Sequence, residues 1–375
     1  MILTDRADQE TRRHILTPRF RTGIMTRMAS TTRYLNRRAA SVENDELRVT
    51  VLQEGGHIAE ILDKRTGVNP LWTPPWPSIE PSTYTAAAHP AYGTNVDAKL
   101  LAGIMGHNVC LDIFGGPSDE EAAAGLTPHG EAAVVPYEIE AMGTVLSMGA
   151  RLPLADLRFE RRIELDGRGL TIHESVENMT AHDHPVGWTQ HVTLGPPFLR
   201  KGLTQFRASA TKSQVVEHGF GADDYLIAGS AFEWPYAPRI DGGIADFRRF
   251  TSAEASSAYT AHLMDPAVAD AFFVAYCPAT RLAFGYVWAR GDFPWLGIWE
   301  ENHSRLAAPW NGRALTRGME FGVSPMPETR RAMIDRGRLF DVPTYRWIPA
   351  KSRVNVEYCA LFLDTDAVPE RLVRP

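Results

Sequence analysis

The sequence predicts an all-β protein, built as a large sandwich or barrel. Short segments in which apolar and polar residues alternate recur along the chain, and turns containing Gly, Asp or Asn separate them. Long amphipathic helical patterns are absent from the sequence, and the best helical candidate spans residues 328–340. Many short strands with regular turns are typical of a sheet that closes on itself or packs on a second sheet.

The first strands are predicted just after residue 41. Leu47, Val49 and Val51 alternate with polar residues, which is the period of a strand with one buried face. A glycine pair then marks a turn, and residues 58–62 form a second apolar segment. The following residues 63–67 are typical of a hairpin turn, so we expect the chain to continue as a sheet.

Residues 70–81 are predicted to form a long ordered loop. Prolines recur through this stretch, and proline cannot donate the backbone hydrogen bond that a central strand or a helix interior requires. Trp72 and Trp76 lie between the prolines, so we expect aromatic packing to hold the loop in place. Long ordered loops often carry functional residues.

Residues 157–165 and 170–178 are predicted to pair as a hairpin. Asp166 and Gly167 supply the turn, because Asp-Gly favours the tight turns that join antiparallel strands. His173 falls on the face of the second strand that we expect to be exposed. Alternation puts four other side chains of that strand on the opposite face: Leu170, Ile172, Glu174 and Val176.

The rest of the chain continues this pattern. Residues 118–125 favour a single helical turn, and residues 178–200 are predicted as a loop that leads into a short strand. No repeat or internal linker divides residues 41–375, so we expect one domain there. Further strands are expected at residues 213–217, 246–250, 258–263, 271–276, 282–288 and 353–363.

The first 40 residues differ in composition from the rest. They contain nine Arg, no Lys and three acidic residues, a charge of about +6, whereas the whole chain carries −6. Residues 41–375 therefore carry −6 minus +6, or about −12, which argues against nucleic-acid binding. We expect residues 1–40 to form a disordered basic extension. The alternatives are a transit peptide and a translation start at Met25 or Met28.

Cys110, Cys277 and Cys359 are widely spaced and lack the pattern of a disulfide framework or a zinc site. Apolar surroundings predict that Cys277 and Cys359 are buried. No apolar run reaches the roughly 18 residues that a membrane-spanning helix needs. The N-terminus also lacks the apolar segment of a secretory signal, and we therefore expect a cytoplasmic protein without membrane contact.

Residues 292–327 concentrate acidic and aromatic residues in one stretch. Aromatic faces stack on the C–H faces of sugar rings, and carboxylates bind hydroxyl groups or transfer protons. Such a stretch is typical of a packed core or of a sugar site, and we favour the sugar site. The residues that suggest it are Glu300, Glu301, Glu320, Trp295, Trp299 and Trp310.

Three short fragments follow one another at residues 128–131, 187–191 and 318–322. The first contains His129 followed by glycine, the second ends at His191 after a predicted strand that ends in asparagine, and the third contains Glu320. In this order the fragments resemble the motifs of the aldose 1-epimerase (galactose mutarotase-like) family. The resemblance implies a large antiparallel β-sandwich and so favours the sandwich over the barrel.

The resemblance extends over residues 45–365 and points to a divergent branch of the family. Phe321 stands where the family commonly has proline after the glutamate. The family's early substrate-binding arginine has no clear counterpart in this chain, so the usual hexose substrate does not follow from the resemblance. Shorter matches to the divergent branch lie at residues 55–59, 69–72 and 308–313.

The resemblance also implies a reaction, the interconversion of sugar anomers by acid–base catalysis. Opening a cyclic hemiacetal requires one group to remove the proton of the anomeric hydroxyl and another to protonate the ring oxygen. By resemblance, Glu320 is the base, His191 is the acid on the opposite side of the ring, and His129 binds a hydroxyl or the ring oxygen. Within the same stretch Glu300 is an alternative base. The reaction needs no metal or organic cofactor.

The remaining candidate residues would bind the sugar. Arg313 and Asp241 are plausible hydroxyl ligands, and Asp246 is a rival for the role of Asp241. An Asp-Gly-Gly sequence is also typical of a turn, which is the alternative for Asp241. Stacking platforms or further ligands would come from Trp188, Trp299, Trp310 and Glu300, although each tryptophan also fits a core position.

Other functions remain open on the sequence alone. A non-catalytic carbohydrate-binding protein, a lyase or a sugar-phosphate mutarotase could all use the same fold. His182, His184 and His191 suggest a metal site, but residues 183–185 are typical of a turn and no carboxylate partner is evident. We therefore expect a small-molecule sugar as the partner, and no metal. The sequence does not indicate the oligomeric state.

Overall fold

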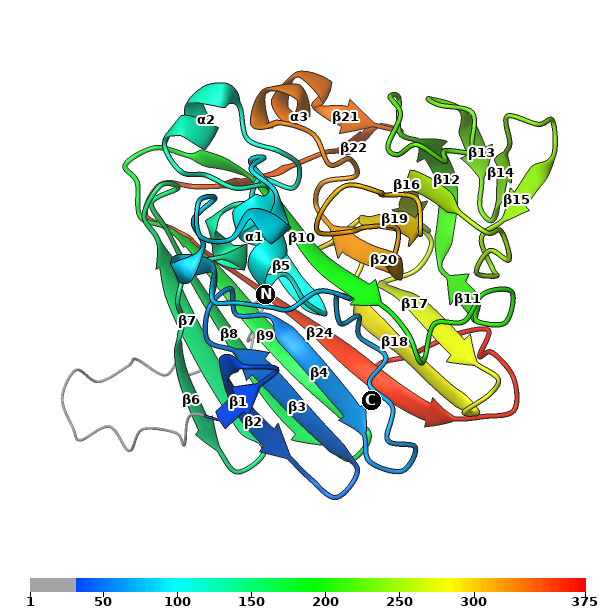
Figure 1. Cartoon of the computed structure of the whole chain (residues 1–375), viewed down its shortest axis with the longest axis horizontal. Coiled ribbons are helices and arrows are strands. Elements are labelled where there is room, and N and C mark those ends of the chain that lie inside the picture. The colour runs from blue at the N-terminus through cyan, green and yellow to red at the C-terminus, as the bar shows by residue number, and fades with distance from the viewer. Residues whose placement is uncertain (1–31) are drawn as a thin grey trace, which may run out of the picture.

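Two antiparallel β-sheets packed face to face make up the computed structural model, which describes residues 32–375 (Figure 1). Their inner faces enclose the main hydrophobic core, so the predicted β-sandwich is confirmed. The outer face of the larger sheet is covered by loops and short helices, which pack a second, aromatic-rich cluster against it. The candidate functional site lies under this cover.

The larger sheet has 12 strands, and β23 pairs with β10 off the main path. In spatial order its strands are β1 (Thr32–Tyr34), β2 (Arg37–Glu43), β3 (Leu47–Leu52), β4 (Ile58–Asp63), β5 (His107–Asp112), β10 (His184–Leu194), β20 (Leu315–Gly322), β19 (Trp295–Asn302), β16 (Ser256–Met264), β12 (Ala210–Val215) and β13 (Ala231–Glu233), with β23 (Arg346–Ile348) beside β10.

The second sheet has eight strands, and two short ribbons complete the β structure. The second sheet runs β11 (Gln205–Ala208), β17 (Asp270–Cys277), β18 (Leu282–Ala289), β24 (Arg353–Asp364), β9 (Gly169–Asn178), β8 (Leu157–Asp166), β7 (Val145–Leu152) and β6 (Glu138–Met142). The ribbons pair β14 (Tyr236–Pro238) with β15 (Ile244–Asp246), and β21 (Arg338–Leu339) with β22 (Val342–Pro343).

Helices are few and short. The α-helices are α1 (Ala98–Gly103), α2 (Asp119–Ala123) and α3 (Arg330–Arg336), and the 3-10 turns are η1 (Pro81–Thr83), η2 (Pro90–Tyr92) and η3 (Glu131–Ala133). The α-helices lie in the upper half of Figure 1. No helix among residues 32–375 is long and apolar enough to cross a membrane.

The hairpin of β8 and β9 follows the sequence pattern closely. Asp166 pairs with Gly169, and Gly167 adopts a φ of 51°, the left-handed conformation that the turn requires. Alternation buries Leu170, Ile172, Glu174 and Val176 between the sheets, as predicted. The strands β3, β16, β17, β18 and β24 and the short helices α2 and α3 also lie where the sequence predicted them, within a few residues.

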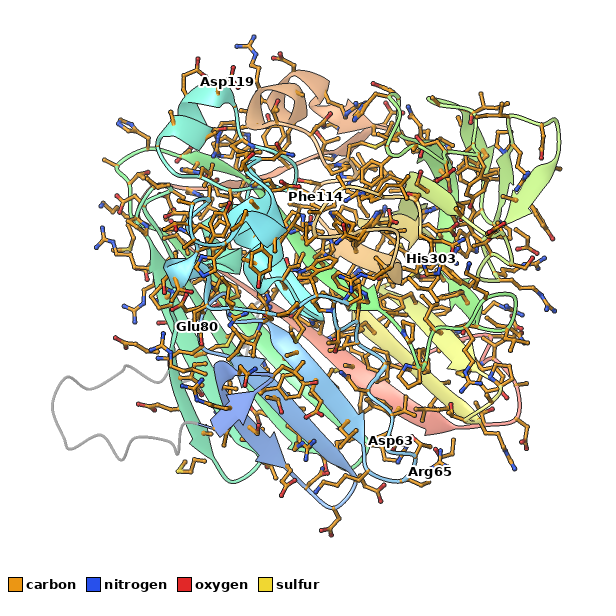
Figure 2. All side chains as sticks on the ribbon, in the orientation of Figure 1. Asp63, Arg65, Glu80, Phe114, Asp119 and His303 are labelled. Carbon is orange, nitrogen blue, oxygen red and sulfur yellow. The ribbon has the colours of Figure 1, made fainter. Side chains whose placement is uncertain are left out.

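The larger sheet begins before residue 41, the predicted boundary, and buried contacts of Arg37 in β2 hold this earlier part in place. Arg37 is fully buried and donates to the carboxylate of Glu80 at 2.9 Å and to the backbone oxygens of Glu54 and Gly103, also at 2.9 Å. This arginine therefore fastens the proline-rich loop and α1 to the sheet, and Figure 2 marks Glu80 in that loop. The rest of the predicted extension lies outside the described residues.

Two further sequence predictions differ from the structure. Residues 178–200 were expected to contain only a short strand, but β10 has 11 residues and lies at the centre of the larger sheet. Its sequence lacks alternation because both of its faces are covered, which removes the period-two signal. Residues 246–250 were expected to form a strand, but β15 ends at Asp246 and the chain continues without a regular strand.

A buried polar network joins the two sheets directly behind β10. Arg161 donates to Glu174 at 2.7 Å, and Glu174 also accepts from the amide of Gln190 and from the hydroxyl of Tyr358 at 2.6 Å. His107 contacts the amide oxygen of Gln190 at 3.0 Å. Because every charged group in this network has a partner, it ties β10 to one register against the second sheet.

We predict that the fold loses stability as pH falls below neutrality, because five buried histidines must stay neutral. Burial lowers the pKa of His57 and His262 to about 3 and that of His129 to about 4, and it holds the pKa values of His107 and His191 well below the usual range. The pKa of a histidine in the unfolded chain is near 6.5. Below that pH the unfolded state binds protons that the folded state does not bind, which favours unfolding.

The contribution of these histidines to the free energy of unfolding should be constant above about pH 7.5 and fall steeply between about pH 6.5 and 4, by up to about 1.4 kcal/mol per pH unit for each histidine. Urea unfolding at a series of pH values measures this dependence. A free energy of unfolding that is unchanged from pH 7 to pH 5 would contradict the burial of neutral histidines.

Candidate functional site

A row of side chains crosses four neighbouring strands on the covered face of the larger sheet. His191 in β10 pairs with Asn108 in β5 on one side and with Glu320 in β20 on the other, and Glu320 pairs with Gly297 in β19. Residues paired across antiparallel strands point to the same face. The register therefore brings the predicted acid and base together without help from any loop.

His191 and Glu320 lie side by side in this row. His191 Nε2 is 3.0 Å from Glu320 Oε1, although the two are not aligned for a hydrogen bond. The other ring nitrogen of His191 is 3.0 Å from the hydroxyl of Thr193. The sequence had suggested groups on opposite sides of a sugar ring. Because the residues are cross-strand neighbours, a ring could lie over both but not between them.

Glycines leave room for the carboxylate. A Cβ atom on Gly318, two residues before Glu320 in β20, would come within 2.2 Å of Glu320 Oε1. On the neighbouring strand, a Cβ on Gly297 would meet the hydroxyl of Tyr259 at 2.1 Å. A side chain at either position would therefore displace the carboxylate of Glu320 or the ring of Tyr259, which border the site.

His129 joins the pair from the chain between α2 and η3. Its ring centroid is 4.6 Å from that of His191, and its φ of 67° is a left-handed conformation that is uncommon outside glycine. Gly130 follows with a φ of 74°, and a Cβ there would overlap the backbone oxygen of Leu111 at 1.9 Å. The His-Gly sequence thus lets the turn approach β5 closely enough to bring His129 over the row.

Burial sets the electrostatics of these three residues. It raises the pKa of Glu320 well above its usual range, and it lowers the pKa of His129 to about 4. The pKa of His191 is held well below its usual value by burial, with a smaller contribution from neighbouring His129. Near neutral pH the histidines are therefore uncharged, and the carboxyl group of Glu320 holds its proton more strongly than an exposed glutamate.

Unpaired polar atoms concentrate around the pair. Buried polar groups are nearly always hydrogen-bonded in folded proteins, so each exception needs an explanation. Twelve buried side-chain atoms of the described chain lack a hydrogen-bond partner, and five of them belong to this one face. These five are Asn108 Nδ2, His129 Nδ1, Thr189 Oγ1, Trp299 Nε1 and Glu320 Oε1. Their mixture of donors and acceptors matches a ligand with several hydroxyl groups.

Tryptophans cover the row. Trp299 lies 5.8 Å from the His191 ring and 6.0 Å from Trp310, measured between ring centroids. Trp310 stacks on Trp72 at 6.1 Å and meets Trp76 edge-on at 4.9 Å. The prediction that aromatic residues hold the proline-rich loop is therefore confirmed, and the same contacts close the loop over the site.

Arg305 forms the outer side of this cover. Its guanidinium lies 4.8 Å from the Trp310 ring and 5.4 Å from the Trp299 ring, in cation–π geometry. Glu301 fixes the start of the β19–β20 loop by accepting from the backbone N–H of Ser304 and of Arg305. Side chains of His191 and Glu320 are consequently only 6 % and 2 % exposed.

Two of the predicted sugar ligands face away from the row. Trp188 lies between the two sheets and donates to Glu174 at 3.2 Å, because it is an odd number of residues from His191 on the same strand. Glu300 also points into the interior, because it is adjacent to Trp299 in β19 and Trp299 faces outward. It is fully buried, 2.9 Å from Arg317 and 2.6 Å from Ser256.

The other predicted ligands lie at turns or in the cover. Asp241 is exposed in the turn between β14 and β15, where Arg239 and the Gly243 N–H hold its pKa near 2. Asp246 is paired with Arg248 on the same ribbon. Arg313 is exposed just before β20, in the turn that follows Trp310. Among the predicted sugar ligands and stacking platforms, Trp299 and Trp310 belong to the cluster over the row.

Several residues at the site had not been identified from the sequence. Asn108 precedes the apolar end of β5 and carries no motif, and Tyr259 lies in a strand of continuous buried residues. Arg305 follows Trp299 and Glu301 in the aromatic-rich stretch, which is the one signal that could have pointed to it. Phe114, marked in Figure 2, packs against Tyr259 with ring centroids 6.2 Å apart.

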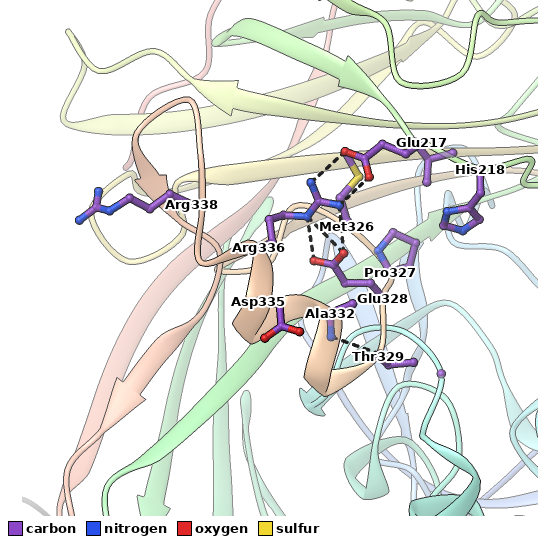
Figure 3. A pocket seen from close by; sticks show the side chains of 12 residues that line it. Glu217, His218, Met326, Pro327, Glu328, Thr329, Ala332, Asp335, Arg336 and Arg338 are labelled. Atoms are coloured by element: carbon purple, nitrogen blue, oxygen red, sulfur yellow. Dashed lines mark hydrogen bonds and ion pairs between the residues drawn. The ribbon is translucent and has the colours of Figure 1, made fainter.

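A cavity lies beside these residues, but it does not open onto the pair. It measures about 840 Å³ and is lined by residues of α3 and of the segments before it and after β12, but not by His129, His191 or Glu320 (Figure 3). Within residues 32–375, no three His, Cys, Asp or Glu side chains gather as metal ligands. All three cysteines are buried and unpaired.

The sequence matches no protein-family model and no curated protein sequence. Solved structures do match the fold. A protein from Klebsiella pneumoniae, provisionally named an aldose 1-epimerase, has a TM-score of 0.62 at 12 % identity, over 88 % of this chain and 80 % of that one. A galactose mutarotase related enzyme from Lactobacillus acidophilus has a TM-score of 0.57 at 12 % identity, covering 88 % and 99 %.

This chain has the galactose mutarotase-like fold. A galactose mutarotase-like protein from Clostridium acetobutylicum gives the same result, with a TM-score of 0.57 at 12 % identity over 88 % of this chain and 96 % of that one. At such identities the likeness establishes architecture and not chemistry. Any reaction of this chain with the galactose mutarotase-like fold must therefore be inferred from the row of side chains itself.

We predict that Glu320→Gln becomes more stable than the wild type as pH rises. The pKa of Glu320 is raised in the folded state, so the stability that its proton provides is present below about pH 4.5 and is lost as pH rises through the folded-state pKa. Glutamine cannot ionise. The difference in unfolding free energy between variant and wild type should grow with pH by about 1.4 kcal/mol per unit within that window.

Urea unfolding of both proteins between about pH 4.5 and 9 measures the effect. Glu138→Gln is the matched control, because Glu138 lies exposed in the edge strand β6 and should show no such growth. A difference between Glu320→Gln and wild type that is independent of pH would show that Glu320 titrates as an ordinary carboxyl group.

Proposed function

We propose that the protein is a sugar mutarotase of the aldose 1-epimerase type, with Glu320 as general base and His191 as general acid. The observation that supports this most is the group of five unpaired buried polar atoms around that pair. A sugar offers hydroxyl groups that can donate and accept, and the aromatic cover offers faces for its C–H groups. The fold of the solved relatives is consistent with this chemistry.

The side-by-side arrangement suits the two atoms that react. The anomeric hydroxyl oxygen and the ring oxygen of a pyranose are bonded to the same carbon, so an acid and a base that serve both must be neighbours. His191 Nε2 and Glu320 Oε1, 3.0 Å apart on one face, meet this requirement. When the hydroxyl of Thr193 donates to Nδ1 of His191, the proton lies on Nε2 and points to the same side.

Each proton transfer in the proposed cycle has a source and a destination. Glu320 takes the proton of the anomeric hydroxyl, the anomeric carbon becomes a carbonyl, and its bond to the ring oxygen breaks as neutral His191 gives that oxygen its Nε2 proton. His191 is then an imidazolate, to which the hydroxyl of Thr193 donates at Nδ1. The aldehyde then rotates and presents its other face. The ring oxygen attacks, returns its proton to His191, and Glu320 returns its proton to the new anomeric hydroxyl. No net proton is consumed.

Burial makes Glu320 suited to this role. A carboxylate whose pKa is raised is a stronger base than an exposed one, and catalysis is most efficient when that pKa is near the working pH. His129, with an unpaired Nδ1, can bind a third oxygen of the sugar. Substrate would enter as the β19–β20 loop, with Arg305 and Trp310, moves away from Trp299.

A non-catalytic carbohydrate-binding protein is the second candidate. The burial of His191 and Glu320 favours it, because neither residue lines the cavity of about 840 Å³ beside α3. Such a protein would gain thermal stability from a sugar without accelerating the exchange of its anomers. The two candidate functions therefore differ in the rate of anomer exchange, and a binding measurement alone does not distinguish them.

We predict that Glu320→Gln lowers the rate of protein-accelerated mutarotation by at least about 100-fold, because it removes the proton acceptor. Polarimetry of freshly dissolved α-D-glucose and α-D-galactose measures the rate. Asp241→Asn is the matched control, since Asp241 lies in an exposed turn, paired with Arg239, and should keep the wild-type rate. Wild-type acceleration that survives in Glu320→Gln would remove the proposed base.

We also predict that the acidic limb of the pH profile lies above the range of an ordinary glutamate. Only the carboxylate form of Glu320 can accept the proton, and burial raises the pKa at which that form appears. The value of kcat/KM should rise with pH through an apparent pKa well above about 4.5. A limb at or below pH 4.5 would be inconsistent with a buried base.

A further inference from the structure

A second cavity lies beside the β14–β15 ribbon and the segment that follows it. Its volume of about 310 Å³ is at the lower end of the range of natural ligand pockets, and neither His191 nor Glu320 lines it. The ribbon is at the right of Figure 1, next to β12 and β13. The lining includes Tyr225, Phe247, Arg249, Phe250, Glu300 and Arg317.

A buried ion pair of the larger sheet forms part of the wall. Glu300 in β19 and Arg317 in β20 are cross-strand partners, and their side chains, 2.9 Å apart, are only 0 % and 2 % exposed. Arg317 is an odd number of positions from Glu320 on the same strand, so the pair faces the opposite side of the sheet from the row. Glu300 also accepts from the hydroxyl of Ser256 at 2.6 Å. The carboxylate of the pair is therefore well supplied with hydrogen bonds.

The guanidinium of the pair has unused donor capacity. Arg317 Nη1 donates to the backbone oxygen of Phe247 at 3.1 Å and Nη2 donates to Glu300, but Nε is a buried atom without a hydrogen-bond partner. The rings of Phe206, Phe247 and Phe250 lie 4.5, 5.5 and 5.2 Å from the guanidinium carbon and hold the group in an apolar surrounding. A buried cation with a free donor is an unusual feature, and an acceptor in the adjacent cavity would satisfy it.

The charges around the cavity leave one cation without a counter-ion. Arg249 lines the cavity, is exposed, and forms no ion pair with any residue of the described part of the chain. With it, four arginines face three carboxylates, which leaves one positive charge. This charge matches a monoanion better than a dianion or a neutral ligand. The three ion pairs that cancel are Arg239 with Asp241, Arg248 with Asp246, and Arg317 with Glu300.

We propose that this cavity is a binding site for a small organic monoanion. Arg249 and Arg317 bind its single carboxylate group, and Phe247 and Phe250 contact a short apolar body. The site is separate from the row of side chains on the covered face, because its ion pair lies on the other side of β19 and β20. Binding here therefore does not depend on the proposed mutarotase reaction.

Calorimetric titration of the full chain at constant ionic strength tests the site. The probes are butyrate and benzoate, with butyramide and benzamide as neutral molecules of nearly the same shape, and sulfate as a dianion. At least one carboxylate should bind about tenfold or more tightly than its amide, because a hydrogen bond between two charged groups is stronger than one to a neutral acceptor. Sulfate should bind more weakly than that carboxylate, because only one cation lacks a counter-ion.

Arg249→Gln removes the unpaired charge at an exposed position and should lower the ratio of carboxylate to amide affinity by about fivefold or more. Arg33→Gln is the matched control, because Arg33 is also exposed but lies in β1, at the opposite edge of the larger sheet, and it should leave the ratio unchanged. Equal affinities for carboxylate and amide, tighter binding of sulfate, a ratio that survives Arg249→Gln, or no binding of any probe would each overturn the proposal. The last result would assign Arg317 and Glu300 a purely structural role.

Discussion

The pairing of β10 with β20 is the constraint on which the rest of the site depends. It sets His191 opposite Glu320 and, through β5 and β19, adds Asn108 and Gly297 to the same row. A shift of one residue would turn His191 into the sandwich and bring Gln190 to the outer face. That shift is opposed by the buried network in which Gln190 donates to Glu174, itself bound by Arg161 at 2.7 Å. The core of the sandwich thus fixes the geometry of the outer face.

Burial raises the basicity of Glu320 and also costs folding stability. The same desolvation that would make Glu320 a strong base holds its carboxylate in a place where a charge is unfavourable. Unpaired donors and acceptors around it are a further cost that packing elsewhere must offset. The tryptophan cover and the loop fastened by Arg37 to Glu80 contribute that packing, so the elements that close the site also stabilise it.

Much of the fold could be predicted from the sequence, because its signals are local. These signals are Asp-Gly turns, period-two alternation and prolines, each of which acts within a few residues. They predicted the β8–β9 hairpin and the proline-rich loop. The approach of His129, His191 and Glu320 could be expected only from their resemblance to family motifs. It arises from pairing between strands far apart in sequence, which no local pattern encodes.

Some residues predicted to bind the sugar lie outside the site, because their side chains also suit a turn or the interior of the sandwich. Asp241 sits in a turn because Asp-Gly-Gly favours one, and Arg239 binds it there. Trp188 and Glu300 are of residue types that are common in sugar sites, but alternation along their strands places their side chains inside the sandwich. In strands buried on both faces, such as β10 and β19, the sequence alone does not distinguish the face that carries chemistry.

The central claim is that this row of side chains transfers protons to and from a sugar. Exchange NMR on sugars labelled with ¹³C at the anomeric carbon tests it most directly, because it reports the interconversion of anomers at equilibrium. We expect the exchange rate of at least one aldose or reducing disaccharide to rise in proportion to the concentration of the wild-type protein. Exchange rates that equal those in buffer for every sugar that binds would contradict the claim.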